Sequence, residues 1–232
     1  MSTQVVILAG GLGTRLRPLT YDIPKPMVPV AGKPFLEHQI LMLRDQGITD
    51  VVLLIGYLGF HIQDHFGDGS RFGVSIRYSV EQTPAGTGGG LMLARPLLAE
   101  QFLVVYGDSF LPIHYPAVMD ALLQSTYEGV LVAYGNDEDT DVKPNLALGE
   151  DGKVLLYLKD TADPRLGYVE AGVSALRRKA LDLLPGEGPF SLEMTLFPRL
   201  IARGSLGAVT TSQRFYDIGT PGRLEDIRRF LR

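Results

Sequence analysis

The sequence contains no cysteine among its 232 residues. This absence excludes disulfide bonds, zinc sites built from thiolates, and catalysis by a thiol nucleophile. It also fits a reducing compartment, where disulfide bonds are rare. We therefore expect a protein of the cytoplasm.

An excess of positive charge and long apolar runs are also missing. The chain carries 22 Lys and Arg against 26 Asp and Glu, so its formal net charge is −4. Such a chain lacks the basic surface that duplex DNA or an anionic membrane binds. No uninterrupted apolar stretch approaches the roughly 20 residues that cross a bilayer. The apolar run at residues 5–9 is too short for a secretory signal. We expect neither nucleic-acid nor membrane partners.

Apolar residues make up 45% of the chain, enough to bury a full core. Short runs rich in Val, Ile, Leu and Tyr recur without alternation, the pattern of strands buried on both faces of a mostly parallel sheet. Segments with helical spacing of apolar residues separate them, so we predict an α/β fold, a Rossmann-like three-layer sandwich. The predicted strands are 4–8, 50–55, 74–78, 102–106 and 130–134, and the predicted helices are 35–46, 87–93 and 117–124.

The pattern changes after about residue 135. Asp151-Gly152 is a hairpin signal between strand-like residues 145–148 and 153–158. We therefore expect a mixed or antiparallel extension of the sheet. No flexible linker, repeat or low-complexity tract divides the chain, so we predict a single domain over residues 1–232. The other elements predicted in this half are strands at 169–176 and 214–217 and helices at 177–183, 192–202 and 224–231.

Residues 8–20 read LAGGLGTRLRPLT and form a glycine-rich loop after a buried strand. Glycines let backbone N–H groups approach an anion closely and allow the positive φ that such a loop needs. Arg15 adds a fork of donors suited to phosphate oxygens. Prolines on both sides of Lys25 are expected to hold that lysine in an extended segment. A plain strand-to-helix turn is the alternative, and the combination of these features favours phosphate binding.

Two other phosphate-binding motifs are excluded. The dinucleotide fingerprint fits Gly11 and Gly13, but Leu16 stands where its third glycine belongs. The Walker loop needs Gly-Lys-Ser/Thr, which this chain does not contain.

The loop, followed by Pro24-Lys25-Pro26, resembles the signature of the sugar-1-phosphate nucleotidyltransferases, and matching elements recur as far as Pro221. The resemblance implies transfer of a nucleotide from a nucleoside triphosphate to a sugar 1-phosphate, with Mg²⁺ as cofactor and pyrophosphate released. It implies that Arg15, Lys25 and Asp108 are catalytic. It assigns the nucleotide to residues 1–135 and the sugar phosphate to residues 136–232. The nucleotide-binding residues that it implies are Leu8, Ala9, Gly10, Gly11, Gly13, Thr14, Arg15, Glu81, Gly86 and Thr87.

Residues 81–90 read EQTPAGTGGG and resemble the base-reading loop of this family, with Glu81 at the position that faces the base. An ionised carboxylate only accepts hydrogen bonds. Guanine presents an N–H and an adjacent amino group, whereas uracil and thymine present a single N–H, so Glu81 favours guanine. In the alternative, Glu81 is a solvated residue at a strand end and backbone groups read the base.

Two aspartates follow strand-like runs and are candidate Mg²⁺ ligands. Asp108 comes after residues 102–106, and Asp217 lies in the sequence YDIGTP. Mg²⁺ takes one or two carboxylates and completes its shell with phosphates and water. A turn cap is the alternative role for Asp108. The resemblance places Asp108 and Asp217 on one catalytic Mg²⁺.

The second half matches the sugar-binding elements of the family with departures. Lys159 matches the lysine that contacts the sugar phosphate, but Leu158 stands where the family has Glu. Glu170 replaces an Asn, and Asn145 replaces a Tyr. These changes indicate a sugar other than plain glucose, although Glu170 and Asn145 as ordinary surface residues are the alternative. Residues 191–193 also resemble a family segment, but a role for Ser191 as a helix N-cap is enough to explain this resemblance.

The resemblance is greatest to the heptose-1-phosphate guanylyltransferases and their mannose-type relatives. Uridylyl or thymidylyl transfer to another sugar 1-phosphate is the alternative within the enzymes. A non-catalytic protein that senses nucleotide sugars is the alternative outside them. Such a sensor has less need of Lys25, Asp108 and Asp217 together, so their presence favours the enzyme.

Overall fold

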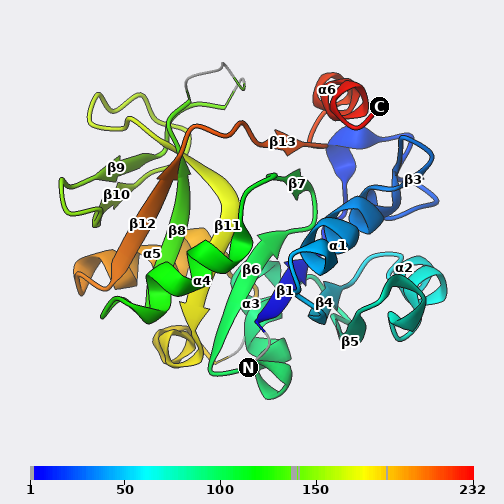
Figure 1. Cartoon of the computed structure of the whole chain (residues 1–232), viewed down its shortest axis with the longest axis horizontal. Helices are drawn as coiled ribbons and strands as arrows, with labels where there is room; N and C mark the ends of the chain where they lie inside the picture. Colours follow the sequence, from blue (N-terminus) through cyan, green and yellow to red (C-terminus); the bar gives the residue numbers. More distant parts are fainter. Residues whose placement is uncertain (1–2, 137–139, 141, 187) are drawn as a thin grey trace.

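A central sheet organises the computed structural model, which describes residues 3–136, 140, 142–186 and 188–232. The sheet has seven strands in the order β12-β8-β11-β6-β1-β4-β5 (Figure 1). The strands are β1 Gln4–Leu8, β4 Asp50–Ile55, β5 Ser75–Val80, β6 Gln101–Tyr106, β8 Gly129–Tyr134, β11 Val169–Arg177 and β12 Leu206–Thr211.

Most strand pairs in this sheet are parallel, which confirms the predicted α/β class. β11 is the antiparallel strand, and it pairs with β6 on one side and β8 on the other. It comes from the second half of the chain but lies inside the sheet, not as an extension at its end. The two halves of the sequence therefore share one sheet.

β12 was not predicted. It runs parallel to β8 at the edge of the sheet, and only its first two residues, Leu206 and Gly207, are buried. An edge strand has fewer neighbours to cover it, so its sequence LGAVTT does not show the apolar run of a central strand.

Helices cover both faces of the sheet (Figure 1). On one face, Val5 and Ile7 share a core cluster with residues of α1, α2 and α4. On the other, Val6 shares a cluster with residues of α3 and α5. All three strand residues are fully buried, and each such side chain contributes roughly 1.5–3 kcal/mol. The helices are α1 Phe35–Asp45, α2 Phe60–Phe66, α3 Gly86–Ala94, α4 Tyr115–Leu123 and α5 Leu192–Ala202.

A third apolar cluster joins the two ends of the chain. The C-terminal helix α6, Pro221–Phe230, contributes Leu224 and Ile227, which pack with Leu16 and Val28 from the segment after β1. Figure 1 shows α6 beside this segment and beside β13. The segment contains two short 3-10 turns and a small hairpin: η1 Thr14–Leu16, η2 Lys25–Met27, β2 Pro29–Val30 and β3 Lys33–Pro34.

Smaller elements complete the described chain. The hairpin expected around Asp151-Gly152 is confirmed, with β9 Leu146–Leu148 antiparallel to β10 Val154–Tyr157. The helix expected at 177–183 is a 3-10 helix, η5 Arg178–Leu183, and the strand expected at 214–217 is reduced to β13 Tyr216–Asp217. β13 pairs with β7, Ser109–Phe110. The remaining 3-10 turns are η3 Ser70–Phe72 and η4 Arg95–Leu97.

No helix in the described part of the chain has the length and apolar character that crossing a membrane takes.

Candidate active site

A cavity of about 300 Å³ opens at the carboxyl ends of three neighbouring parallel strands. Leu8 ends β1, Tyr106 ends β6, Leu54 lies near the end of β4, and all three line it. The volume is in the range of small-molecule sites, and open α/β sheets bind ligands at this edge. The cavity is therefore the candidate site.

Many of the residues predicted for nucleotide binding and catalysis line this cavity. Gly10 and Gly11 form one wall, and Glu81, Pro84, Gly86 and Thr87 form another. Gly90 leaves space for the Glu81 side chain, since a Cβ on residue 90 would lie 2.5 Å from the Glu81 Oε1 atom. The predicted residues that line the cavity are Leu8, Ala9, Gly10, Gly11, Lys25, Glu81, Gly86, Thr87 and Asp108.

Lys25 reaches the cavity from the turn η2. Its Nζ donates a hydrogen bond to Asp108 Oδ2 at 2.5 Å, and the residue is 9% exposed. Lys25 begins a 3-10 turn and does not lie in the extended segment that we predicted. Proline is accepted in the first turn of a helix, where no N–H partner is needed, so Pro26 fits there. Gly13 lies against this lysine, since a Cβ on Gly13 would be 3.0 Å from Lys25 Cβ.

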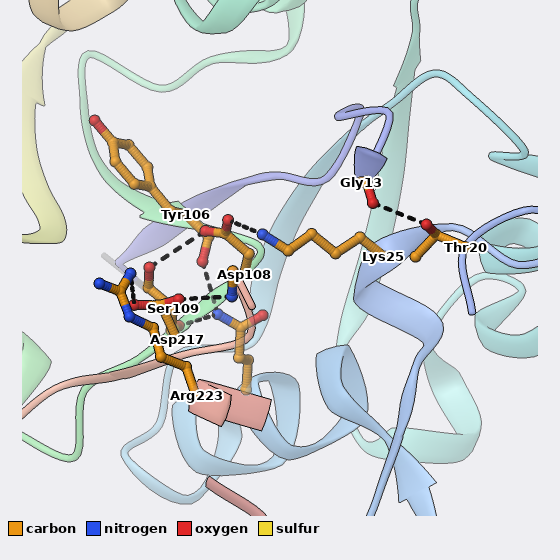
Figure 2. A network of polar contacts seen from close by, with 10 residues as sticks. Gly13, Thr20, Lys25, Tyr106, Asp108, Ser109, Asp217 and Arg223 are labelled. Atoms are coloured by element: carbon orange, nitrogen blue, oxygen red, sulfur yellow. Dashed lines mark hydrogen bonds and ion pairs between the residues drawn. The ribbon is translucent and has the colours of Figure 1, made fainter. Parts of the chain in front are cut away.

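Asp217 lies next to Asp108 because their backbones are paired. Asp217 is opposite Ser109 in the β7–β13 ladder, and the Ile218 N–H donates to the Asp108 carbonyl at 3.0 Å. Burial raises the pKa of Asp217, and the negative charge of Asp108 adds to the rise. Arg223 Nη1 lies 3.1 Å from Asp217 Oδ2 (Figure 2).

Asp217 does not line the cavity, but its backbone pairing holds it beside the turn that carries Asp108. Two carboxylates on such paired segments suit Mg²⁺, which needs only one or two protein oxygens beside substrate phosphates. Among the residues that the structure describes, no group of three or more His, Cys, Asp or Glu side chains forms a closed metal site. The donor set of Asp108 and Asp217 therefore fits an ion held jointly by protein and nucleotide.

Arg15 and Thr14 lie outside the cavity, on the exposed turn η1. The guanidinium of Arg15 lies near the Asp217 loop, residues 217–220 between β13 and α6. A Cβ on Gly219 would be 3.5 Å from Arg15 Nη2 and 2.6 Å from Asp217 Oδ1. The glycine-rich loop and the C-terminal loop thus meet at the rim of the site.

The residues predicted for the sugar phosphate, Asn145, Lys159 and Glu170, lie near one another. The Glu170 N–H donates to Asn145 Oδ1 at 2.8 Å, and Glu170 Oε1 accepts from the Gly172 N–H at 2.8 Å. Burial raises the pKa of Glu170 to about 8, and the negative charge of Glu193 adds to the rise, whereas Lys159 opposes it. A register shift in the β11–β8 pairing, between Glu170 and Ser174, marks a bulge beside the site.

Glu193 is a site residue that the sequence reasoning missed. It lines the cavity and is only 4% exposed. Its Oε1 accepts from the Tyr106 hydroxyl at 2.5 Å, and its Oε2 accepts from Thr87 at 2.9 Å and Ser191 at 2.5 Å. Burial acts to raise the pKa of Glu193, but hydrogen bonds from Ser191 and Tyr106 outweigh it, so the pKa lies below its usual value.

This network ties three elements around the cavity. Thr87 lies in the first turn of α3, Tyr106 ends β6, and Ser191 caps α5 by accepting from the Met194 N–H at 3.0 Å. The predicted N-cap role of Ser191 is confirmed. The sequence analysis attributed residues 191–193 to this N-cap alone and therefore assigned Glu193 no role in the site.

Comparison with known proteins supports the geometry. Residues 4–144 match the family model described as nucleotidyl transferase. The chain is 36% identical to mannose-1-phosphate guanylyltransferase of Mycobacterium tuberculosis over 230 residues, covering 94% of this chain and 61% of the relative. It is 32% identical to D-glycero-alpha-D-manno-heptose 1-phosphate guanylyltransferase of Campylobacter jejuni, covering 98% of each chain.

A solved structure shares the whole fold. The crystal structure of HddC from Yersinia pseudotuberculosis has a TM-score of 0.85 and 30% sequence identity, covering 99% of this chain and 100% of that one. A second structure of HddC, complexed with GMP-PN, has a TM-score of 0.84.

The raised pKa of Glu170 predicts a pH-dependent stability. The folded state keeps a proton on Glu170 up to about pH 8, whereas an unfolded glutamate releases it near pH 4.3. Stability is therefore lost as the pH rises from about 4.3 towards 8. The variant Glu170→Gln does not titrate, so its Tm relative to wild type should increase by at least about 2 °C between pH 5 and pH 9. Thermal melts across this range check it, and parallel curves would contradict it.

Proposed function

The chain belongs to the nucleotidyl transferase family, and we propose that it transfers a guanylyl group from GTP to a heptose- or mannose-like sugar 1-phosphate and releases pyrophosphate. The observation that carries this proposal is the meeting of Lys25 and Asp108 in the cavity walled by Gly10, Gly11 and Glu81. Two relatives named as guanylyltransferases and the GMP-PN complex of HddC support guanine as the base. We also propose a cytoplasmic location, because nucleoside triphosphates are cytoplasmic substrates.

The reaction that we propose needs no general base. An oxygen of the sugar phosphate attacks the α-phosphorus of the triphosphate in line, and pyrophosphate leaves. The second pKa of a phosphomonoester is about 6, so this nucleophile is already ionised at pH 7. The protein has to align two mutually repelling anions and stabilise charge on the phosphoryl oxygens.

Lys25 supplies positive charge inside the cavity. Its ammonium group is paired with Asp108 here, and a phosphate entering the cavity offers it a second anionic partner. Arg15, beside the Asp217 loop, supplies a second positive charge to the phosphates. Lys159 supplies a third near the sugar phosphate, and its charge acts to lower the pKa of both Glu170 and Glu193. Asp108 and Asp217 would hold Mg²⁺, which when bound supplies further positive charge for the phosphate oxygens.

Glu81 is the residue that we propose for base recognition. Its Oε2 accepts from the Ala85 N–H at 3.1 Å, which fixes the side chain against its own loop. Its Oε1 lies over Gly90, where only the lack of a side chain leaves space. In the ionised carboxylate both oxygens are acceptors and neither is a donor, which suits the two adjacent donors of guanine.

Lys25→Ala and Asp108→Asn are each predicted to lower kcat by at least about 10²-fold. Lys25→Ala removes a positive charge that acts on the transferring phosphate, and Asp108→Asn removes a carboxylate that would hold Mg²⁺. Steady-state pyrophosphate release measures kcat, and circular dichroism verifies the fold. Lys33→Ala is the control, since Lys33 is exposed and pairs with Glu37 away from the cavity. Near-normal turnover in either site variant would refute these roles.

The nucleotide preference tests the proposal as a whole. Pyrophosphate release with GTP, UTP and dTTP, each with mannose or heptose 1-phosphate, should be fastest with GTP. Fastest release with UTP or dTTP refutes guanylyl transfer, and nucleotide binding without release from any triphosphate indicates a sensor.

Glu81→Gln is predicted to lower the GTP-to-UTP ratio of kcat/KM by about 10-fold, because an amide donor then faces a donor of guanine. Gln82→Ala is the matched control, because Gln82 is the next residue and lies outside the cavity. An unchanged ratio in Glu81→Gln would show that backbone groups read the base.

A further inference from the structure

Gln39 lies in the middle of α1 and is fully buried, yet its amide reaches the turn that carries Asp108. Its Nε2 donates to the Tyr106 carbonyl at 2.9 Å and to the Ser109 carbonyl at 2.5 Å. These carbonyls flank Asp108, one on each side along the chain. One side-chain amide therefore spans the catalytic turn.

The backbone of this turn is held from two other directions. The Gly107 N–H donates to the Leu8 carbonyl at 2.9 Å, which ties the turn to β1. The Asp108 carbonyl accepts from the Ile218 N–H at 3.0 Å, which ties it to the Asp217 loop. Gln39 is the third attachment, and it comes from the helix behind the turn.

The orientation of the Gln39 amide is determined by its partners. Two carbonyls need donors, so the NH₂ group faces them and each of its hydrogens has an acceptor. Oε1 is then buried without a hydrogen-bond partner among the described residues. Leaving a buried acceptor unsatisfied is unfavourable, and an apolar side chain of similar volume does not carry this cost.

We infer that Gln39 is a positioning residue that holds the Asp108 carboxylate beside Asp217 and thereby sets the place of the metal-bound triphosphate. This inference rests on the proposed function, because it assigns Asp108 and Asp217 to the metal. A displacement of about 1 Å in a reacting group can cost 10²-fold in rate, so the attachment of the turn matters even though Gln39 does not line the cavity.

Isothermal titration calorimetry with a non-hydrolysable GTP analogue tests the inference without turnover. In Gln39→Leu, the affinity in the absence of Mg²⁺ should stay within about 2-fold of wild type. The gain in affinity that Mg²⁺ gives wild type should fall by about 10-fold or more, as for outer partners of metal ligands. The Mg²⁺ concentration for half-maximal pyrophosphate release should rise, and Tm should fall no further than in Gln46→Leu, because two carbonyls lose a donor while the unpaired Oε1 is also removed.

Gln46→Leu is the matched control. Gln46 caps the same helix, donates to the Ile113 carbonyl at 2.9 Å and accepts from the Tyr115 N–H at 2.8 Å. It therefore bonds to backbone in the same manner, but beyond the catalytic turn. Its loss should lower Tm and leave the Mg²⁺ effect unchanged.

The inference is overturned if Gln39→Leu keeps the full Mg²⁺ effect, or if it loses only stability as Gln46→Leu does. Gln39→Met, unbranched and adaptable, is the second variant if leucine does not fold. If neither variant folds, the amide is required for folding and the positioning role is rejected. A wild-type chain that shows the Mg²⁺ effect but releases no pyrophosphate with any sugar refutes the proposed function and not the role of Gln39.

Discussion

The ion pair between Lys25 and Asp108 is the interaction on which the rest of the site depends. It joins the glycine-rich N-terminal segment to the end of β6 across a distance of 2.5 Å. Burying the Lys25 ammonium group without a partner would be costly, and Asp108, whose side chain is 35% exposed, supplies the opposite charge. A phosphate that approaches Lys25 and a cation that approaches Asp108 each meet a charge of opposite sign that is already in position. The pair thus prepares the cavity for both ligands.

The fold brings these groups together through pairings that are distant in sequence. The parallel strands β1, β4 and β6 end at one edge and form the cavity, and β7 carries the chain on to pair with β13. Helix α6 packs against the segment after β1 and keeps Asp217 next to Asp108. Glu193, which lines the cavity, accepts hydrogen bonds from the hydroxyl groups of Thr87, Tyr106 and Ser191. The site is therefore a meeting point of the two ends of the chain.

Central strands and motif residues could be predicted from sequence, whereas features set by tertiary contacts could not. β1 and β4 match the predicted bounds because both of their faces are buried, and Lys25 and Asp108 stand in motifs that specify chemistry. β12 lies at an exposed edge, and the place of β11 between β6 and β8 depends on pairing that no local pattern encodes. Gln39 is one polar residue in an amphipathic helix, so only its partners in space distinguish it from a solvated side chain.

A crystal structure of the chain with a non-hydrolysable GTP analogue and Mg²⁺ tests the central claim most directly. The account predicts the triphosphate in the cavity, Lys25 in contact with a phosphate oxygen, and one metal ion between Asp108 and Asp217. A nucleotide bound elsewhere, or bound here with Asp108 turned away from the metal and the phosphates, would contradict it.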